Sequence, residues 1–227
     1  MKILMEELQG IEINGLMLEG LLAVPPDARG LVLFAHGSGS SRHSPRNNFV
    51  AQFLCDHGMG SLLMDLLRPE EDMDPSARFD IALLTERLVA ATRWVRQQPL
   101  ARHLPVGYFG ASTGAAAALR AAAQLRPLVQ AVVARGGRPD LAGAAALGKV
   151  ACPTLLLVGS LDSEVLALNR QAARQMHAEV HLTLVPGATH LFEEPGTLEA
   201  VARHAAQWFD AHWTHKHPGH QPIGASF

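Results

Sequence analysis

The sequence predicts an α/β fold in which helices cover both faces of a mostly parallel sheet. Two observations support this prediction. Short apolar segments alternate with segments of helical periodicity along most of the 227 residues, the order typical of parallel sheets. Several of the apolar segments, such as Leu31–Ala35, contain no polar position at all. Strands of this kind are buried on both faces, as in a sheet between two helical layers.

The elements can be assigned in order from the N-terminus. Ile3–Leu8 and Leu16–Val24 are expected to form an antiparallel hairpin, because Asn14-Gly15 between them is a strong turn signal. The strands expected after the hairpin are Leu31–Ala35, Ser61–Leu66, Val106–Phe109, Val129–Ala134, Thr154–Val158 and His181–Val185. The helices expected from apolar periodicity or from alanine content are Phe49–His57, Asp80–Gln97, Ala115–Ala123, Val165–Met176 and Thr197–Ala211.

Length and composition are those of one globular domain. Apolar residues make up 48% of the chain and charged residues 18%, which excludes a disordered chain. We expect residues 1–211 to form a single domain. Residues 212–227 are expected to be a poorly ordered tail, because their histidines alternate with proline and glycine. The net charge of −2 favours neither nucleic acid nor an anionic membrane as partner, and no apolar run could span a bilayer.

The remaining global features predict a cytoplasmic protein without a cofactor. The N-terminus has no long apolar segment and turns acidic at Glu6-Glu7, so it is not a secretory signal. Cys55 and Cys152 have no metal-binding spacing and are expected to be structural thiols in a reducing compartment. No metal site is expected, since the tail histidines lack a rigid framework. The expected partner is a small-molecule substrate, and an exposed strand or helix at the sheet edge could mediate a homodimer.

The segment Gly110-Ala111-Ser112-Thr113-Gly114 is the most informative motif in the chain. It has the G-x-S-x-G pattern of a nucleophile elbow and lies between an expected strand and an alanine-rich helix. Glycine on both sides allows a turn too tight for larger residues. The helix N-terminus beneath Ser112 favours developing negative charge. The sequence therefore predicts that Ser112 is a catalytic nucleophile.

An acid and a histidine follow the elbow in the order that a serine triad would need. Asp162 lies just past the strand Thr154–Val158, and His190 lies just past His181–Val185. Because the carboxyl ends of parallel strands meet at one sheet edge, both can reach Ser112. Alone, Asp162 would be interpreted as a helix N-cap and His190 as a surface histidine. Glu164 is the nearest substitute acid, whereas Glu193 and Glu194 follow His190 closely and could simply face solvent.

The oxyanion donors are expected on either side of the nucleophile. One is the backbone N–H of Thr113, directly after Ser112. The second is expected in the loop that follows Leu31–Ala35, where Ser38 is the first choice and Gly39 the alternate. His36, at the start of that loop, is expected to hold the loop in place rather than to act as the base.

Two polar segments at the same edge carry arginines. Arg42 and Arg46 follow the loop that contains Ser38 and Gly39. Arg135 and Arg138 follow the strand Val129–Ala134. These arginines could bind a substrate carboxylate or phosphate through a bidentate contact. They could equally tie loops together through nearby acids. The acids available for this are Asp65, Asp72 and Asp140.

These motifs resemble the α/β-hydrolase superfamily over nearly the whole chain, and the compact size resembles its dienelactone hydrolase group. The segments 40–47, 135–140 and 185–192 are similar to a bacterial subgroup of that group. Some relatives in the subgroup also carry a phosphoribosyltransferase domain, and none is expected here. Dienelactone hydrolases proper use cysteine as nucleophile, whereas the elbow here carries Ser112. The resemblance implies ester-type hydrolysis and does not specify dienelactone as substrate.

The expected function is hydrolysis of a small ester or lactone by a serine enzyme. Only about twenty residues separate Ala134 from Thr154, too few for the helical cap that many relatives insert. An open cleft without a gating lid is therefore expected. Two alternatives stay open from the sequence. One is thioester hydrolysis or acyl transfer, and the other is a ligand-binding module without catalysis.

Overall fold

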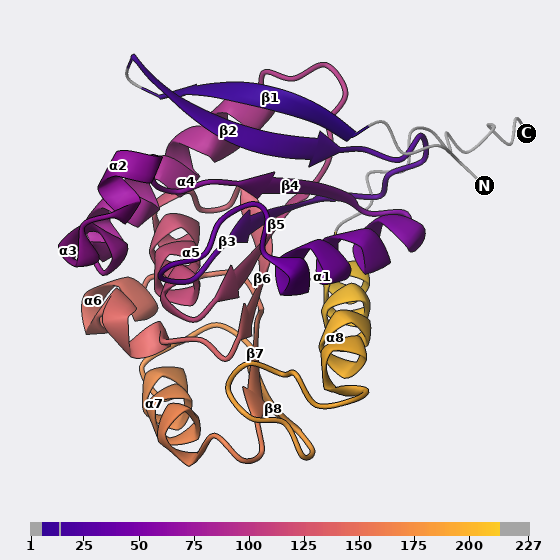
Figure 1. The fold of residues 1–227 in the computed structure, drawn as a ribbon. Coiled ribbons are helices and arrows are strands. Elements are labelled where there is room, and N and C mark those ends of the chain that lie inside the picture. The colour runs from indigo at the N-terminus through magenta and orange to yellow at the C-terminus, as the bar shows by residue number, and fades with distance from the viewer. Residues whose placement is uncertain (1–5, 14, 214–227) are drawn as a thin grey trace, which may run out of the picture.

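The computed structural model describes residues 6–13 and 15–213, which form an eight-stranded sheet with helices on both faces (Figure 1). The strand order is β1-β2-β4-β3-β5-β6-β7-β8. The strands are β1 (Glu6–Ile13), β2 (Leu16–Ala23), β3 (Leu31–Ala35), β4 (Gly60–Met64), β5 (Val106–Ala111), β6 (Val129–Arg135), β7 (Thr154–Gly159) and β8 (Val180–Val185). The pairs β1–β2 and β2–β4 are antiparallel, and every later pair is parallel. This confirms the α/β-hydrolase fold.

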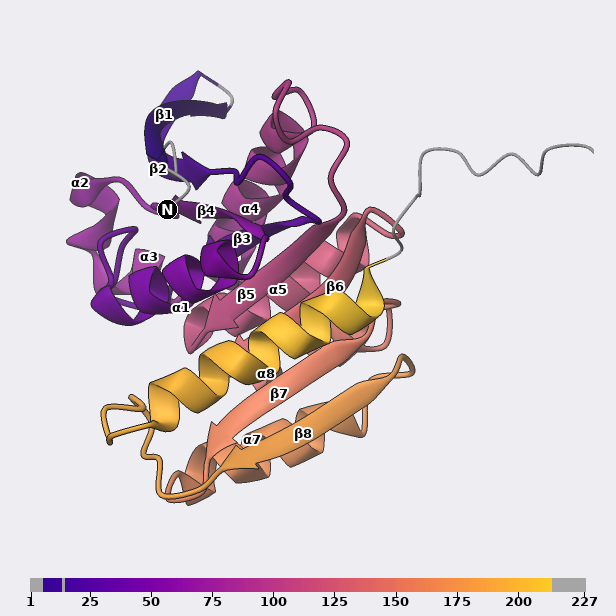
Figure 2. The same cartoon turned by 90° about the vertical axis from the view of Figure 1, so that its right-hand side faces the viewer.

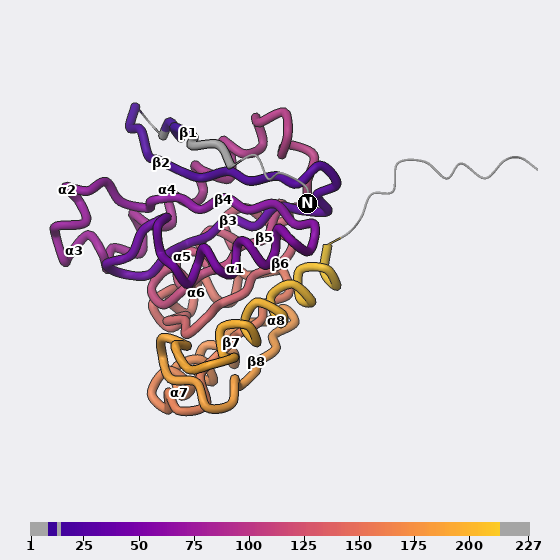
Figure 3. The backbone as a smooth tube through the Cα atoms, turned by 45° about the vertical axis from the view of Figure 1, so that its right-hand side comes forward, coloured from indigo at the N-terminus to yellow at the C-terminus, as the bar shows by residue number. Residues whose placement is uncertain are grey.

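The central strands are buried because both of their faces are covered. Every residue of β3, β4, β5 and β7 is buried. One layer consists of α1 (Pro45–Asp56) and α8 (Thr197–His212), which lie side by side (Figures 2 and 3). The other consists of α4 (Ile81–Val95), α5 (Thr113–Gln124) and α7 (Ser163–Ala173). The two large apolar clusters therefore lie on opposite sides of the sheet.

The opening hairpin differs from its expected bounds. We expected the first strand to end at Leu8, yet β1 continues to Ile13 and pairs with β2 along its whole length. The strand continues because Ile11 is fully buried opposite Leu18, and this apolar pair outweighs the glycine at position 10. The expected start at Ile3 lies outside the described residues.

Helix α1 starts four residues before its expected beginning at Phe49. Ser44 caps the helix, since its hydroxyl accepts the N–H of Asn47 at 3.3 Å. Pro45 follows at the first helical position, which suits its fixed backbone angle. The short elements α2 (Pro69–Asp72), α3 (Pro75–Arg78), η1 (Pro139–Ala142) and α6 (Ala144–Leu147) were not expected either. Each spans four residues, too few to show a periodic pattern.

The C-terminal helix reaches slightly beyond the expected domain end at residue 211. His212 is the last residue of α8, and Trp213 is only 3% exposed. The indole of Trp213 packs against Gly30, where an added Cβ would lie 2.5 Å from the ring. Residues 214–227 of the expected tail lie outside the described part of the chain.

No cap domain interrupts the described residues, and β6 and β7 are joined only through η1 and α6. Cys55 and Cys152 are both buried, and neither forms a disulfide within the described ranges. Among residues 6–13 and 15–213, no helix has both the length and the apolar content needed to cross a bilayer.

Candidate active site

Ser112 stands on a sharp turn between β5 and α5. Its φ of 50° and ψ of −121° are unusual for a residue with a side chain, a strain of about 1–3 kcal/mol that neighbouring structure must hold. Two hydrogen bonds do so: the Ser112 N–H donates to the carbonyl of Arg135 at 3.2 Å, and its carbonyl accepts the N–H of Arg138 at 3.0 Å. The turn is therefore fixed to the end of β6.

The flanking glycines of the elbow are required by close packing. An added Cβ at Gly110 would lie 2.5 Å from the Cα of Ala115, and one at Gly114 would lie 2.1 Å from the carbonyl oxygen of Ala35. Both contacts involve backbone atoms, which cannot swing away. The G-x-S-x-G spacing thus allows α5 to pack directly against β5 and the end of β3.

His190 and Asp162 form a hydrogen-bonded pair. His190 Nδ1 lies 2.7 Å from Asp162 Oδ2. The His190 side chain is 40% exposed and that of Asp162 13%. Because an ionised carboxylate only accepts, Nδ1 carries the proton in this bond and Nε2 of a neutral ring is left as a base. The structure thus joins two of the three residues expected to form the triad.

Asp162 also caps helix α7. Its Oδ1 accepts the N–H of Val165 at 3.4 Å, while Oδ2 binds His190. One oxygen of this carboxylate therefore caps the helix, and the other makes the contact with His190 that the predicted triad requires. Glu164, the substitute acid, is exposed in the first turn of α7.

Gly136 connects the His190 loop to the nucleophile. An added Cβ at Gly136 would lie 3.1 Å from the carbonyl oxygen of His190 and 3.6 Å from its ring atom Cε1. Gly136 follows Arg135, whose carbonyl binds the N–H of Ser112. The Ser112 hydroxyl and the His190 ring are not hydrogen-bonded to each other within the described residues. Such contacts between nucleophile and base are often long before substrate binds and tighten afterwards.

Residues 36–41, the loop expected to supply the second oxyanion donor, pack closely against Ser112. An added Cβ at Gly37 would lie 3.0 Å from Ser112 Cβ and 3.8 Å from its Oγ. Ser38 and Gly39 are exposed in a turn closed by the bond from the Ser40 N–H to the Gly37 carbonyl, at 3.2 Å. Thr113 is the first residue of α5, where backbone N–H groups have no partner within the helix.

His36 is bonded through both ring nitrogens. Nε2 accepts the N–H of Leu66 at 2.9 Å, so Nδ1 carries the proton and donates to the carbonyl of Gly37 at 2.9 Å. Burial lowers the pKa of this imidazole, although the Gly37 bond opposes the shift. In this arrangement the ring holds the loop of residues 36–41 against the loop after β4.

Three of the four arginines considered from the sequence are paired with carboxylates. Arg42 binds Asp65 and Glu19. Arg46 binds Glu193 at 2.8 Å. Arg138 holds both carboxylate oxygens of Asp140, at 2.8 and 2.9 Å. Arg42 thus ties its loop to other segments, as one alternative expected, whereas the pair of Arg138 with Asp140 is local to one segment.

Arg135 differs from the other three arginines. It is only 7% exposed, and within the described ranges no carboxylate pairs with it. Its guanidinium carbon lies 5.8 Å from the centre of the Phe192 ring, and its Nη2 lies 3.5 Å from Asn47 Oδ1. Burial, together with the like charge of Arg46, lowers the pKa of Arg135 to about 10, so it remains a cation at neutral pH.

Sequence reasoning missed the residues that hold the His190 loop. Glu194 accepts both the N–H and the hydroxyl of Thr189, at 3.1 and 2.5 Å, and these bonds lower the pKa of Glu194. Glu193 is bound by Arg46. From the sequence both acids could simply face solvent; in the structure Glu193 is exposed and Glu194 half-buried, and both tether the loop. No sequence pattern marks these contacts: the Arg46–Glu193 pair joins segments that meet only in the folded chain, and the Thr189–Glu194 bonds belong to an irregular loop.

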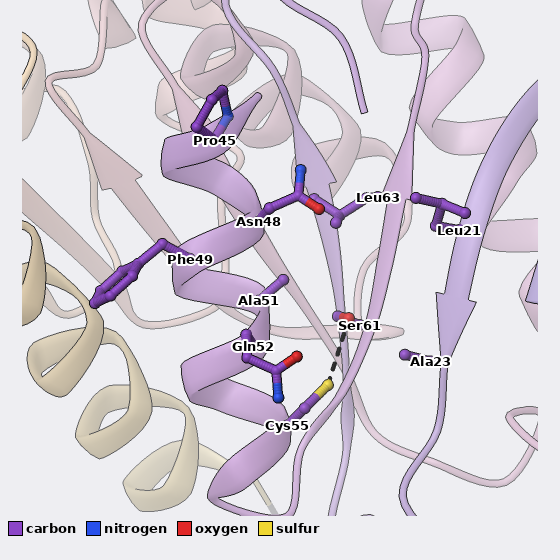
Figure 4. Close-up of a pocket in the computed structure, with 10 residues that line it drawn as sticks. All are labelled: Leu21, Ala23, Pro45, Asn48, Phe49, Ala51, Gln52, Cys55, Ser61 and Leu63. Carbon is purple, nitrogen blue, oxygen red and sulfur yellow. Dashed lines mark hydrogen bonds between the residues drawn. The ribbon is translucent and has the colours of Figure 1, made fainter. Parts of the chain in front are cut away.

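A separate hollow of about 350 Å³ lies between α1 and strands β2 and β4 (Figure 4). It is lined from the helix by Phe49, Gln52 and Cys55. The Cys55 Sγ contacts the Ser61 Oγ of β4 at 3.6 Å. None of Ser112, Asp162 and His190 lines this hollow. The candidate active site is therefore the edge formed by the carboxyl ends of the parallel strands, and not this hollow.

A parallel sheet, a serine elbow and an Asp–His pair at the carboxyl ends of its strands define an α/β-hydrolase. Residues 18–214 match the Dienelactone hydrolase family, and the chain belongs to that family of hydrolases. A solved structure of a dienelactone hydrolase from Anabaena variabilis is 51% identical, with a TM-score of 0.89 over 93% of this chain and 99% of that one. Est1E from Butyrivibrio proteoclasticus has the same fold at 16% identity, with a TM-score of 0.76 over 90% of this chain and 98% of that one.

Curated relatives from Mycobacterium tuberculosis are longer proteins. They carry the provisional name phosphoribosyl transferase and are 58% identical to this chain over 193 residues. The match covers 85% of this chain and 43% of each relative. The chain thus spans less than half the length of the curated relatives that it matches.

Proposed function

We propose that this chain is a serine hydrolase that cleaves a small ester or lactone, with Ser112, His190 and Asp162 as its catalytic triad. The observation that carries the proposal is the 2.7 Å bond between His190 Nδ1 and Asp162 Oδ2, at the sheet edge where Ser112 stands on its elbow. Membership of a hydrolase family and the fold shared with esterases support it.

The reaction proceeds in two halves. Ser112 Oγ attacks the carbonyl carbon while His190 Nε2 takes the hydroxyl proton, and Asp162 stabilises the resulting imidazolium. The tetrahedral intermediate collapses, the carbon–oxygen bond to the leaving group breaks, and His190 returns the proton to the departing alkoxide. Water then attacks the acyl-enzyme with His190 again as base, which releases the acid and restores Ser112.

The backbone N–H groups of Thr113 and Ser38 are proposed to stabilise the oxyanion, with Gly39 as the alternate donor and a substrate contact. The close approach of Gly37 to Ser112 and the position of Thr113 at the start of α5 support this assignment. One such donor typically contributes about 3 kcal/mol to transition-state stabilisation. Arg42 and Arg46, already paired with carboxylates, are proposed to shape the loops around the substrate.

Activity on short-chain p-nitrophenyl esters tests the proposal. The purified protein should release a burst of nitrophenol, followed by steady turnover. Ser112→Ala removes the nucleophile and should lower kcat by a factor on the order of 10⁴ or more. Ser76→Ala makes the same chemical change at an exposed serine of α3 and should leave kcat unaltered. The proposal would be refuted if Ser112→Ala turned over these esters as fast as the wild type.

A further inference from the structure

Arg135 is a buried cation next to the proposed nucleophile, and the hydrolysis described above does not use its side chain. It ends β6 and is only 7% exposed. A methionine of similar length would fill this space without the desolvation that a charge undergoes. The guanidinium must therefore contribute something that an apolar side chain would not.

The observed contacts of the guanidinium are with protein groups rather than with a carboxylate. Its Nε is closed to solvent and has no hydrogen-bond partner among the described residues. One face is occupied by the Phe192 ring, at 5.8 Å between the guanidinium carbon and the ring centre. The Asn47 side chain of α1 approaches Nη2 at 3.5 Å. Arg135 thus contacts an aromatic ring on one face and the Asn47 amide at Nη2.

Phe192 belongs to the loop that carries His190. It lies two residues after His190, is 1% exposed, and has a φ of 56°, which is rare for an aromatic residue. Gly136 contacts both residues: an added Cβ there would lie 3.1 Å from the His190 carbonyl oxygen and 3.3 Å from the Phe192 ring. The loop therefore rests on the Arg135–Gly136 segment.

The first turn of α1 holds the same loop from its other side. Arg46 binds Glu193 at 2.8 Å, and the adjacent Asn47 contacts Arg135. The Arg46–Glu193 pair has side chains 34% and 62% exposed, so solvent screens much of its attraction. The buried contact between Arg135 and Phe192 is shielded from water, where a cation–π interaction is strongest.

We propose that Arg135 is a positioning residue: its buried guanidinium supports Phe192 and thereby sets the place of His190 relative to Ser112. This inference rests on the proposed function of His190. A planar guanidinium lies flat against an aromatic ring, whereas a lysine ammonium is a point charge that would seek water. The shape of the cation is therefore as important as its charge.

Kinetics of Arg135→Met and Arg135→Lys test the inference, with Arg96→Met as the matched control. Arg96 lies at the end of α4, where its Nη1 binds the Leu104 carbonyl at 3.1 Å. Misplacing His190 should lower kcat about 10- to 100-fold in both Arg135 variants and leave KM unchanged. The factor should be the same for neutral and carboxylate-bearing esters, and labelling of Ser112 by a fluorophosphonate should slow in parallel. Arg96→Met should match the wild type in kcat and in labelling.

A double-mutant cycle with Phe192→Leu identifies the contact through which Arg135 acts. If the two side chains work together, Arg135→Met/Phe192→Leu should be no slower than the slower single variant. The inference would be overturned if the double variant lowered kcat by the product of the two single effects. It would also be overturned if kcat were unchanged in Arg135→Met, or if KM increased only for carboxylate-bearing esters. Thermal melting identifies unfolded variants, and the cycle is run with Arg135→Lys if Arg135→Met does not fold. A wild type that neither labels nor turns over would instead contradict the proposed function.

Discussion

Among single residues, His36 is fixed by its two bonds in one charge state. Its ring accepts the Leu66 N–H through Nε2, a bond that requires an unprotonated nitrogen. The ring is 5% exposed, and burial is the main reason why its pKa lies below the ordinary value of 6.5. The folded protein therefore resists protonation of His36, while the unfolded chain does not.

This difference predicts how stability depends on pH. Well above pH 6.5 the ring is neutral in both states and has no effect of this kind. As the pH falls through 6.5, only the unfolded chain takes up the proton, and the free energy of unfolding decreases by up to about 1.4 kcal/mol per pH unit. His36→Gln removes the titration and, by weakening two bonds, should destabilise the protein by about 1–2 kcal/mol at neutral pH.

The stability gap between wild type and His36→Gln should therefore narrow as the pH is lowered from neutral to mildly acidic values. Urea unfolding of both proteins across this range measures the gap directly. Other titrating groups change both proteins equally and cancel in the difference. A gap that stays constant or widens towards low pH would show that His36 is not held neutral.

On the scale of secondary-structure elements, Asp162 gives one carboxylate oxygen to α7 and the other to His190. The helix thereby fixes the carboxylate, and the carboxylate orients the His190 ring. Asparagine caps helices about as well as aspartate, yet its amide cannot stabilise an imidazolium. Substitutions at this position can therefore separate the capping role from the catalytic one.

Asp162→Asn should retain nearly all stability and lose activity by a factor on the order of 10⁴, since a neutral amide favours the wrong histidine tautomer. Asp162→Ala should lose similar activity and about 1 kcal/mol of stability as well. Asp80→Ala is the matched control, because Asp80 caps α4 by accepting the Leu83 N–H at 3.0 Å. It should lose comparable stability and keep its kcat. Full activity in Asp162→Asn would exclude Asp162 as the orienting acid.

The elements also show what the sequence can and cannot predict. Continuous apolar runs located the buried strands closely: Leu31–Ala35 was expected as observed, and β7 extends the expected run by one residue. The start of α1 was missed because its first turn contains the polar residues Arg46 and Asn47, which give no apolar periodicity. The Ser44 cap and Pro45 mark this start locally, so capping residues can locate a helix end that apolar periodicity does not reach.

On the scale of the whole molecule, the site gathers loops from five parallel strands at one edge of the sheet. The residue types of the proposed triad could be predicted, since each follows a strand of the expected sheet. The support for His190 could not: Gly136, Phe192 and Glu194 have no motif, and their roles depend on how the ends of β6, β7 and β8 meet. Of these contacts between strand ends, the one at Gly159 is the closest.

Gly159 ends β7, and an added Cβ would lie 2.4 Å from the carbonyl oxygen of Ala188 and 2.6 Å from that of Thr189. Both contacts are with backbone atoms of the segment leading into His190. The next residues add to the junction, as the Leu161 N–H donates to the Ala188 carbonyl at 3.0 Å. Any side chain at Gly159 must therefore push the His190 loop away from the Asp162 loop.

Gly159→Ala should destabilise the protein by about 1–3 kcal/mol through overpacking and, while still folded, lower kcat by about tenfold or more. Gly148→Ala adds the same methyl group where the nearest atoms are 3.5 Å away, an ordinary contact, so its stability and kcat should match the wild type. Circular dichroism confirms folding before kcat is compared, and urea unfolding measures stability. If Gly159→Ala kept its kcat while losing stability, the junction would hold the sheet together without controlling the place of His190. Stability and kcat are expected to fall together, because the backbone contact of Gly159 with the segment before His190 both packs the end of the sheet and brings His190 close to Asp162.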